Sequence, residues 1–110
     1  MPEARLATGI WVSAYLARLG QQNIPAYILS HGDDTAGAVL VKCARLDGTA
    51  QLWAREWDFE TDTRGWRITQ SGDERAVDEA IRKQRRFDPD LWVVEVESRE
   101  GRVLLGEEGL

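Results

Sequence analysis

Tryptophans and arginines alternate in two neighbouring segments, and this group is the one best suited to binding. Trp53, Arg55 and Trp57 occupy alternate positions of one predicted strand, and Trp66 and Arg67 lie in the next. Residues two apart in a strand share a face, so the first three side chains should project together. Such a surface can stack the bases of single-stranded RNA or form the centre of a protein interface. The competing interpretation places the indoles in the core and the arginines in solvent.

A second group combines arginines with carboxylates at the end of a predicted helix. Arg85 and Arg86 close a basic run, and Asp88 and Asp90 follow directly. Guanidinium groups hold phosphate or carboxylate groups through paired donors, and two carboxylates could divide acid and base roles. The alternative function is therefore a small enzyme or an anion-binding domain. The same residues also suit a solvated helix end followed by a turn.

The remaining reactive residue types give weaker signals. His31, the only histidine, precedes two aspartates, and Cys43, the only cysteine, lies within an apolar segment. We expect a solvent-facing histidine and a buried, inert thiol. No spacing typical of metal ligands, phosphate-binding glycine loops or serine nucleophiles occurs in the sequence. We therefore predict no metal and no cofactor, and we favour a non-enzymatic role while the enzyme alternative stays open.

Hydrophobic periodicity predicts the elements that hold these side chains. Thr8 is the predicted N-cap of the first helix, and Ser71 with Glu74 matches a capping box for the second. Asp47-Gly48 is a strong hairpin signal. The predicted elements are a helix over 6–19, strands over 26–30, 38–46, 50–57 and 65–69, a helix from 71 to about 87, a strand over 91–97 and a short strand over 103–105.

This order, α-β-β-β-β-α-β, predicts the α+β class. Strands joined by short turns pair antiparallel, so we expect an antiparallel sheet of about five strands. The strand over 38–46 is apolar on both sides, which favours a central position in the sheet. We expect both helices to pack on one face of that sheet.

Length and charge limit the class of protein. The 110 residues suit a single α+β domain over 1–110, with residues 1–5 and 106–110 loose. No apolar run approaches the roughly 20 residues of a membrane span, and one cysteine cannot form an internal disulfide. These features predict a cytoplasmic protein that does not enter a membrane. The net charge of −5 disfavours nucleic acid, so a protein partner or self-association is the favoured mode of binding.

Four segments of the chain together resemble one family of short bacterial proteins. They are Gly9–Leu16, Ala36–Lys42, Arg45–Gly48 and Arg85–Glu97, and the last is the most specific. The family, mainly alphaproteobacterial, is the domain of unknown function 1491, and the likeness spans roughly residues 5–105. The resemblance implies a small cytoplasmic protein of one domain. It implies no activity, so it assigns no catalytic residue.

Overall fold

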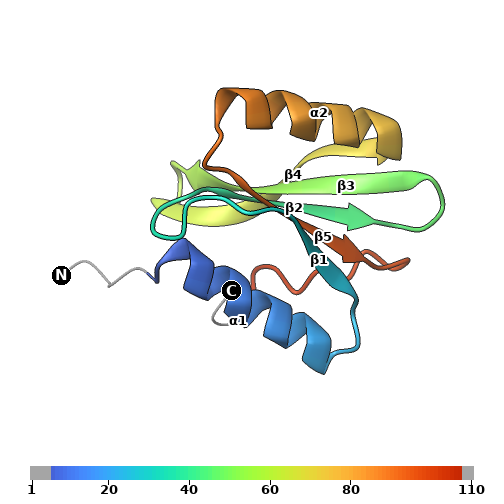
Figure 1. Ribbon diagram of the computed structural model, residues 1–110, viewed down its shortest axis with the longest axis horizontal. Coiled ribbons are helices and arrows are strands. Elements are labelled where there is room, and N and C mark those ends of the chain that lie inside the picture. The colour runs from blue at the N-terminus through green and yellow to red at the C-terminus, as the bar shows by residue number, and fades with distance from the viewer. Residues whose placement is uncertain (1–5, 108–110) are drawn as a thin grey trace.

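One five-stranded sheet lies between two helices in the computed structural model, which describes residues 6–107 (Figure 1). The order of elements along the chain is α-β-β-β-β-α-β, as the sequence indicates. The elements are α1 (Thr8–Gln21), β1 (Ala26–Ser30), β2 (Val39–Ala44), β3 (Thr49–Asp58), β4 (Thr63–Asp73), α2 (Glu74–Phe87) and β5 (Trp92–Glu97).

The sheet is mixed, whereas the sequence predicted a purely antiparallel one. Its strand order is β1-β5-β2-β3-β4. The short turns make β2–β3 and β3–β4 antiparallel, as expected, and β1–β5 is antiparallel too. β5 is parallel to β2 because α2 carries the chain back across the sheet before β5 begins. β5 therefore separates β1 from β2, and the loop between those two strands does not form a hairpin.

The helices cover opposite faces of the sheet, which corrects the prediction that both lie on one face (Figure 1). α1 packs on the face that holds Val41, Cys43 and Val94. α2 packs on the other face, where Val77 meets Leu52. The central strands β2 and β5 carry apolar side chains on both sides, so each side needs its own cover.

The helix caps differ from the predicted ones. Ser71 lies inside β4, and Asp73 caps α2 by accepting a hydrogen bond from the Ala76 N–H. Thr8 is the first residue of α1, and its hydroxyl donates to the carbonyl of Gly37 instead of capping the helix. Pairing with β3 extends β4 beyond the predicted limits at both ends, which overrides the local capping signal.

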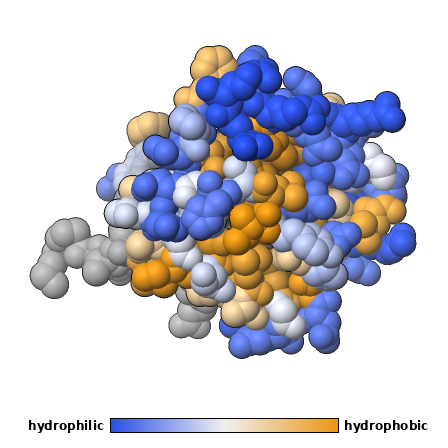
Figure 2. Space-filling view, viewed as in Figure 1, coloured by the Kyte–Doolittle hydropathy of each residue, from blue (hydrophilic) through white to orange (hydrophobic). Residues whose placement is uncertain are grey.

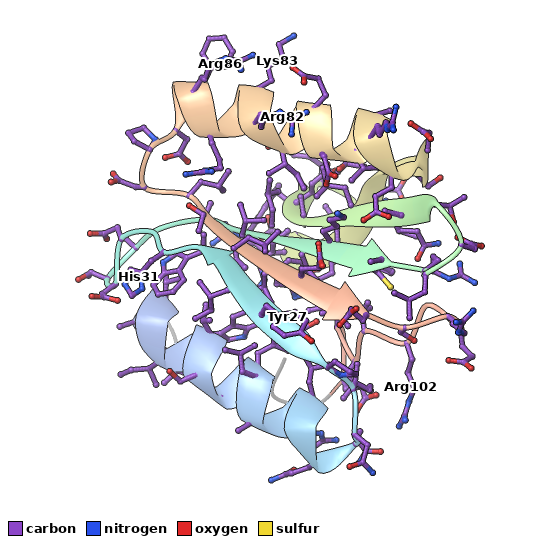
Figure 3. All side chains as sticks on the ribbon, turned by 45° about the vertical axis from the view of Figure 1, so that its right-hand side comes forward. Tyr27, His31, Arg82, Lys83, Arg86 and Arg102 are labelled. Atoms are coloured by element: carbon purple, nitrogen blue, oxygen red, sulfur yellow. The ribbon has the colours of Figure 1, made fainter. Side chains whose placement is uncertain are left out.

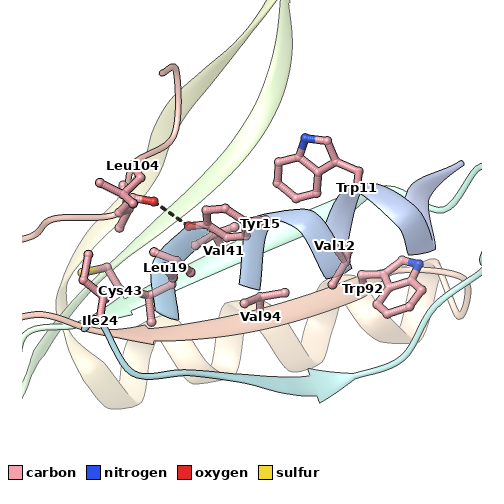
Figure 4. Close-up of a cluster of buried hydrophobic side chains, with 12 residues drawn as sticks. Trp11, Val12, Tyr15, Leu19, Ile24, Val41, Cys43, Trp92, Val94 and Leu104 are labelled. Carbon is pink, nitrogen blue, oxygen red and sulfur yellow. Dashed lines mark hydrogen bonds between the residues drawn. The ribbon is translucent and has the colours of Figure 1, made fainter. Parts of the chain in front are cut away.

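The segment after β5 packs into the α1-side core without forming the predicted strand. Val103 and Leu104 are buried there. The hydroxyl of the buried Tyr15 donates a 2.7 Å hydrogen bond to the carbonyl of Val103 (Figure 4). Side-chain burial and this bond hold the segment against α1, together with contacts of Arg102 to Gln22 and of Arg18 to Glu107. Within the described residues, no helix is long and apolar enough to cross a membrane.

Candidate hairpin interface

The long β3–β4 hairpin presents three cross-strand pairs on the side of the sheet that α1 covers. The pairs alternate aromatic or aliphatic residues with arginines, as expected for side chains two residues apart along each strand. We call this surface the hairpin face. It consists of Trp53 opposite Ile68, Arg55 opposite Trp66 and Trp57 opposite Arg64.

The inner end of the hairpin face is tied to α1 by aromatic stacking. The ring of Trp66 lies 5.4 Å from that of Trp11, which in turn stacks on Tyr15 at 5.0 Å. The guanidinium of Arg55 lies over the Trp66 ring at 5.3 Å, within cation–π range. Trp53 and Trp66 are partly buried and pack against the core beneath α1. The two inner tryptophans therefore lie partly in the core, as the competing interpretation of the sequence expects.

The outer end of the hairpin face is exposed. At this end the side chain of Trp57 is 46% exposed, and at the other end of the face that of Ile68, opposite Trp53, is 44% exposed. Phe59, in the turn between the strands, is almost fully exposed. Trp11 and Trp92, by contrast, are buried in the core. The hairpin thus extends apolar side chains into solvent beyond the part of the sheet that the core requires.

The hairpin face carries no acid of β3 or β4, because the acids of these strands near it project from the reverse side. Both charged residues of the hairpin face are arginines, whereas Glu56 and Asp58 project from the reverse side. Arg67 also projects from the reverse side, where it pairs with Asp58 at 3.1 Å. The pKa of the Asp58 carboxyl is lowered, mainly by a hydrogen bond from the backbone N–H of Glu60 and also by the positive charge of Arg67. Arg67, which the sequence grouped with the tryptophans, is therefore not part of the hairpin face.

The fold does not bring together the second predicted group, the arginines and aspartates at the end of α2. Arg86 points away from the sheet on the outer side of α2 (Figure 3). Arg85, with Arg82, lines a hollow of about 260 Å³ between α2 and β1. Asp88 and Asp90 do not line this hollow. Instead, a carboxylate oxygen of Asp88 accepts from the Asp90 N–H and shapes the turn before β5.

The floor of this hollow contains a charge cluster that the sequence analysis missed. Lys42, only 3% exposed, projects from β2 toward α2. Its Nζ lies 2.7 Å from carboxylate oxygens of Glu74 and Asp78, both on α2, and 3.0 Å from Glu95 on β5. Burial alone would lower the pKa of Lys42, but hydrogen bonds to Asp78, Glu74 and Glu95 outweigh it and raise that pKa. The amine is therefore a charged ammonium at neutral pH, a form that is not a nucleophile.

The lone histidine and cysteine occupy the environments that the sequence predicts. His31 is exposed, its Nε2 lies 3.0 Å from a carboxylate oxygen of Asp34 that accepts its hydrogen bond, and its ring lies against that of Trp92. Cys43 is fully buried, and burial raises the pKa of its thiol. Among the described residues, no group of three or more His, Cys, Asp or Glu side chains is arranged to hold a metal ion.

Comparisons with known proteins place the chain in a family. The family model of DUF1491, a protein of unknown function, matches residues 6–106. No curated protein matches the chain. A crystal structure of a DUF1491 family protein from Caulobacter crescentus CB15 is 39% identical, with a TM-score of 0.84 over 94% of this chain and 97% of that one.

Two solution structures agree with this comparison. An NMR structure of a DUF1491 family protein from the same organism is 37% identical, with a TM-score of 0.80 over 96% of each chain. The solution structure of protein Atu0922 from A. tumefaciens is 28% identical, with a TM-score of 0.76 over 93% of each chain. On the extent of the family match and these likenesses, the chain belongs to the DUF1491 family of proteins of unknown function.

Proposed function

We propose that the protein is a binding module and that the hairpin face docks a polypeptide partner. The observation that carries this proposal is the exposed outer end of the face, where the indole of Trp57 projects into solvent opposite Arg64 and next to the turn that carries Phe59. Trp and Arg are the residue types enriched in the energetic centres of protein interfaces. A large indole gains free energy when a partner covers it.

The rigidity of the hairpin face supports the same role. Trp66 is fixed between Trp11 and Arg55, so the centre of the face is ordered before any partner arrives. A preorganised surface loses less conformational entropy on binding than a flexible one does. The exposed indole of Trp57 therefore projects from a fixed platform.

The charge of the hairpin face defines the partner. Arg64 supplies positive charge at the outer end, opposite Trp57, and the acids of β3, Glu56 and Asp58, project from the reverse side. Complementary potentials steer association and select partners. The partner we propose is a polypeptide segment that combines Asp or Glu with apolar side chains.

Selection from a random peptide library tests this proposal with a defined probe. The library is selected on the wild-type protein, on a double variant with Trp57→Ala and Arg64→Glu, and on Phe87→Ala. Phe87 is 82% exposed at the end of α2, so its variant removes an even more exposed aromatic from another surface. We expect peptides that carry acids beside apolar residues, that bind the wild type and Phe87→Ala, and that fail to bind the double variant.

Two other outcomes would overturn the proposal. Peptides that bind the double variant as well as the wild type would place the binding surface elsewhere. If a labelled oligouridine bound in a Trp57-dependent way while acidic peptides did not bind, the hairpin face would be a single-stranded RNA surface. The salt dependence of oligouridine binding would identify that second case.

A further inference from the structure

The edge strand β1 exposes apolar side chains on both of its faces. Tyr27 and Leu29 are about half exposed, and Ile28 is 44% exposed. In Figure 2 a hydrophobic band crosses the molecule in this region, beneath the hydrophilic side chains of α2. The opposite edge strand, β4, carries charged residues and glycines along its length. β1 carries none of the charges that natural proteins place on sheet edges to prevent pairing.

The backbone of β1 is oriented to accept another strand. The Glu97 N–H donates to the carbonyl of Pro25 across the β1–β5 pair. Because hydrogen-bonding direction alternates along an antiparallel strand, Tyr27 also faces β5, and Ala26 and Ile28 direct their N–H and C=O groups outward. β1 is last in the strand order, so β5 is its only partner among the described strands.

The two ends of β1 carry opposite charge on the α2 side of the sheet. At the N-terminal end, the carboxylate of Glu97 raises the pKa of the Tyr27 hydroxyl, which places an acid beside that side chain. At the C-terminal end, Leu29 lines the hollow beside Arg85. Figure 3 looks onto this region, with Tyr27 on β1 and Arg82 on α2. An antiparallel copy of β1 would reverse these ends and set acid against base.

We propose that β1 pairs with β1 of a second copy of this chain, about a twofold axis at Ile28. The outward N–H and C=O groups of Ile28 then bond to those of its symmetry mate, and Tyr27 packs on Leu29 of the other copy. Glu97 of each copy lies near Arg85 of the other. Such an interface is self-complementary, as a twofold contact must be, and it joins two sheets into one of ten strands.

Few side chains take part, so this contact belongs to the weak, concentration-dependent class. Sedimentation velocity over a concentration series of the wild-type protein should show a monomer–dimer equilibrium. Ile28→Lys places two like charges opposite each other and should leave only monomer. Ile68→Lys is the matched control, because Ile68 is equally exposed on the other edge strand. This control should dimerise like the wild type.

Reciprocal charge changes test the predicted arrangement of the two copies. Arg85→Glu alone creates acid–acid contacts in its own dimer, and Glu97→Arg alone creates base–base contacts. Both single variants should therefore self-associate less than the wild type. An equimolar mixture restores two opposite-charge contacts and should form the heterodimer. Circular dichroism melts confirm that every variant is folded.

Three results would overturn the inference: wild-type protein that is monomeric throughout the series, Ile28→Lys that still dimerises, or a mixture that associates no better than its components. The inference does not depend on the proposed function. Trp57→Ala removes the hairpin contact but leaves β1 intact, so its dimerisation should be unchanged. Loss of dimerisation in Trp57→Ala would instead assign self-association to the hairpin face.

Discussion

The ring of Trp66 stacks on that of Trp11 with centroids 5.4 Å apart, and this contact joins the β3–β4 hairpin to α1. Trp66 reaches the core on one side and supports Arg55 on the other. The same contact therefore serves the stability of the fold and the rigidity of the surface that we assign to binding.

Removing Trp11 should destabilise the protein far more than removing Trp57. Trp11→Ala leaves a cavity beneath Trp66 and should cost about 3–5 kcal/mol of unfolding free energy. Trp57→Ala removes a half-exposed ring and should cost under about 1 kcal/mol. Urea denaturation measures both values. Similar costs for the two variants would mean that Trp57 belongs to the core and would remove the main support for the hairpin interface.

Lys42→Met should be strongly destabilising even though methionine is apolar and of similar length. The change leaves the carboxylates of Glu74, Asp78 and Glu95 together without their ammonium. Loss of one member of a buried ion pair typically costs about 3–5 kcal/mol, and because the three carboxylates are 21–35% exposed the cost here should lie toward the low end of that range. Urea denaturation at neutral pH measures it.

Glu79→Gln is the matched control for that variant. It breaks an exposed pair with Arg82 on the same helix, and such pairs contribute about 0–1 kcal/mol. If Lys42→Met were as stable as Glu79→Gln, the cluster would have no role in folding.

The pKa of Lys42 also predicts how stability changes at alkaline pH. Its folded-state pKa lies above the ordinary value of 10.5. The stabilisation from this group is therefore complete below pH 10.5 and is lost as the pH rises through the folded pKa. Burial also raises the pKa of Tyr15, so this residue adds a further loss of stability as the pH rises above 10.0. The alkaline slope of unfolding free energy should be shallower in Lys42→Met, in which the lysine contribution is absent and those of Tyr15 and Cys43 remain; equal slopes would contradict this assignment.

Two glycine substitutions should change stability in opposite directions. A Cβ at Gly37 would lie 2.4 Å from the carbonyl oxygen of Asp90, a backbone atom that cannot move aside cheaply. Gly20 lies in α1, and a Cβ there meets nothing within 4 Å. Gly37→Ala should therefore lower the melting temperature, whereas Gly20→Ala should raise stability by up to about 1 kcal/mol. A neutral Gly37→Ala would show that the loop before β2 does not pack against Asp90 as described.

Local patterns were sufficient to predict most elements but not their arrangement. The apolar residues on both sides of β2 correctly indicated a central strand. A strand that is apolar on both sides also implies that another element packs on each face of the sheet. Which face each helix covers, however, depends on the nonlocal β2–β5 pairing. Ser71 and Glu74 match a capping box in isolation. In the fold, pairing of Ser71 with Gln51 keeps that residue in the sheet.

The candidate sites show the same division between local and nonlocal information. Alternation placed Trp53, Arg55 and Trp57 on one face, and the structure places Trp66 opposite Arg55. The bulge after Leu52 changes the register, which a count of residues cannot reveal. The carboxylates that pair with Lys42 come from two further segments of the chain. The signal that could have indicated the cluster was a lysine among apolar residues in a central strand, which requires buried partners.

The most direct test of the hairpin interface is a two-dimensional proton–nitrogen NMR titration with an acidic, apolar peptide obtained by the library selection. The indole N–H signals of the five tryptophans report on separate parts of the molecule. The interface predicts that the Trp57 signal shifts most, that Trp66 follows and that the buried Trp92 stays unchanged. A titration that moved Trp92 and the α2 amides, and left Trp57 in place, would contradict it.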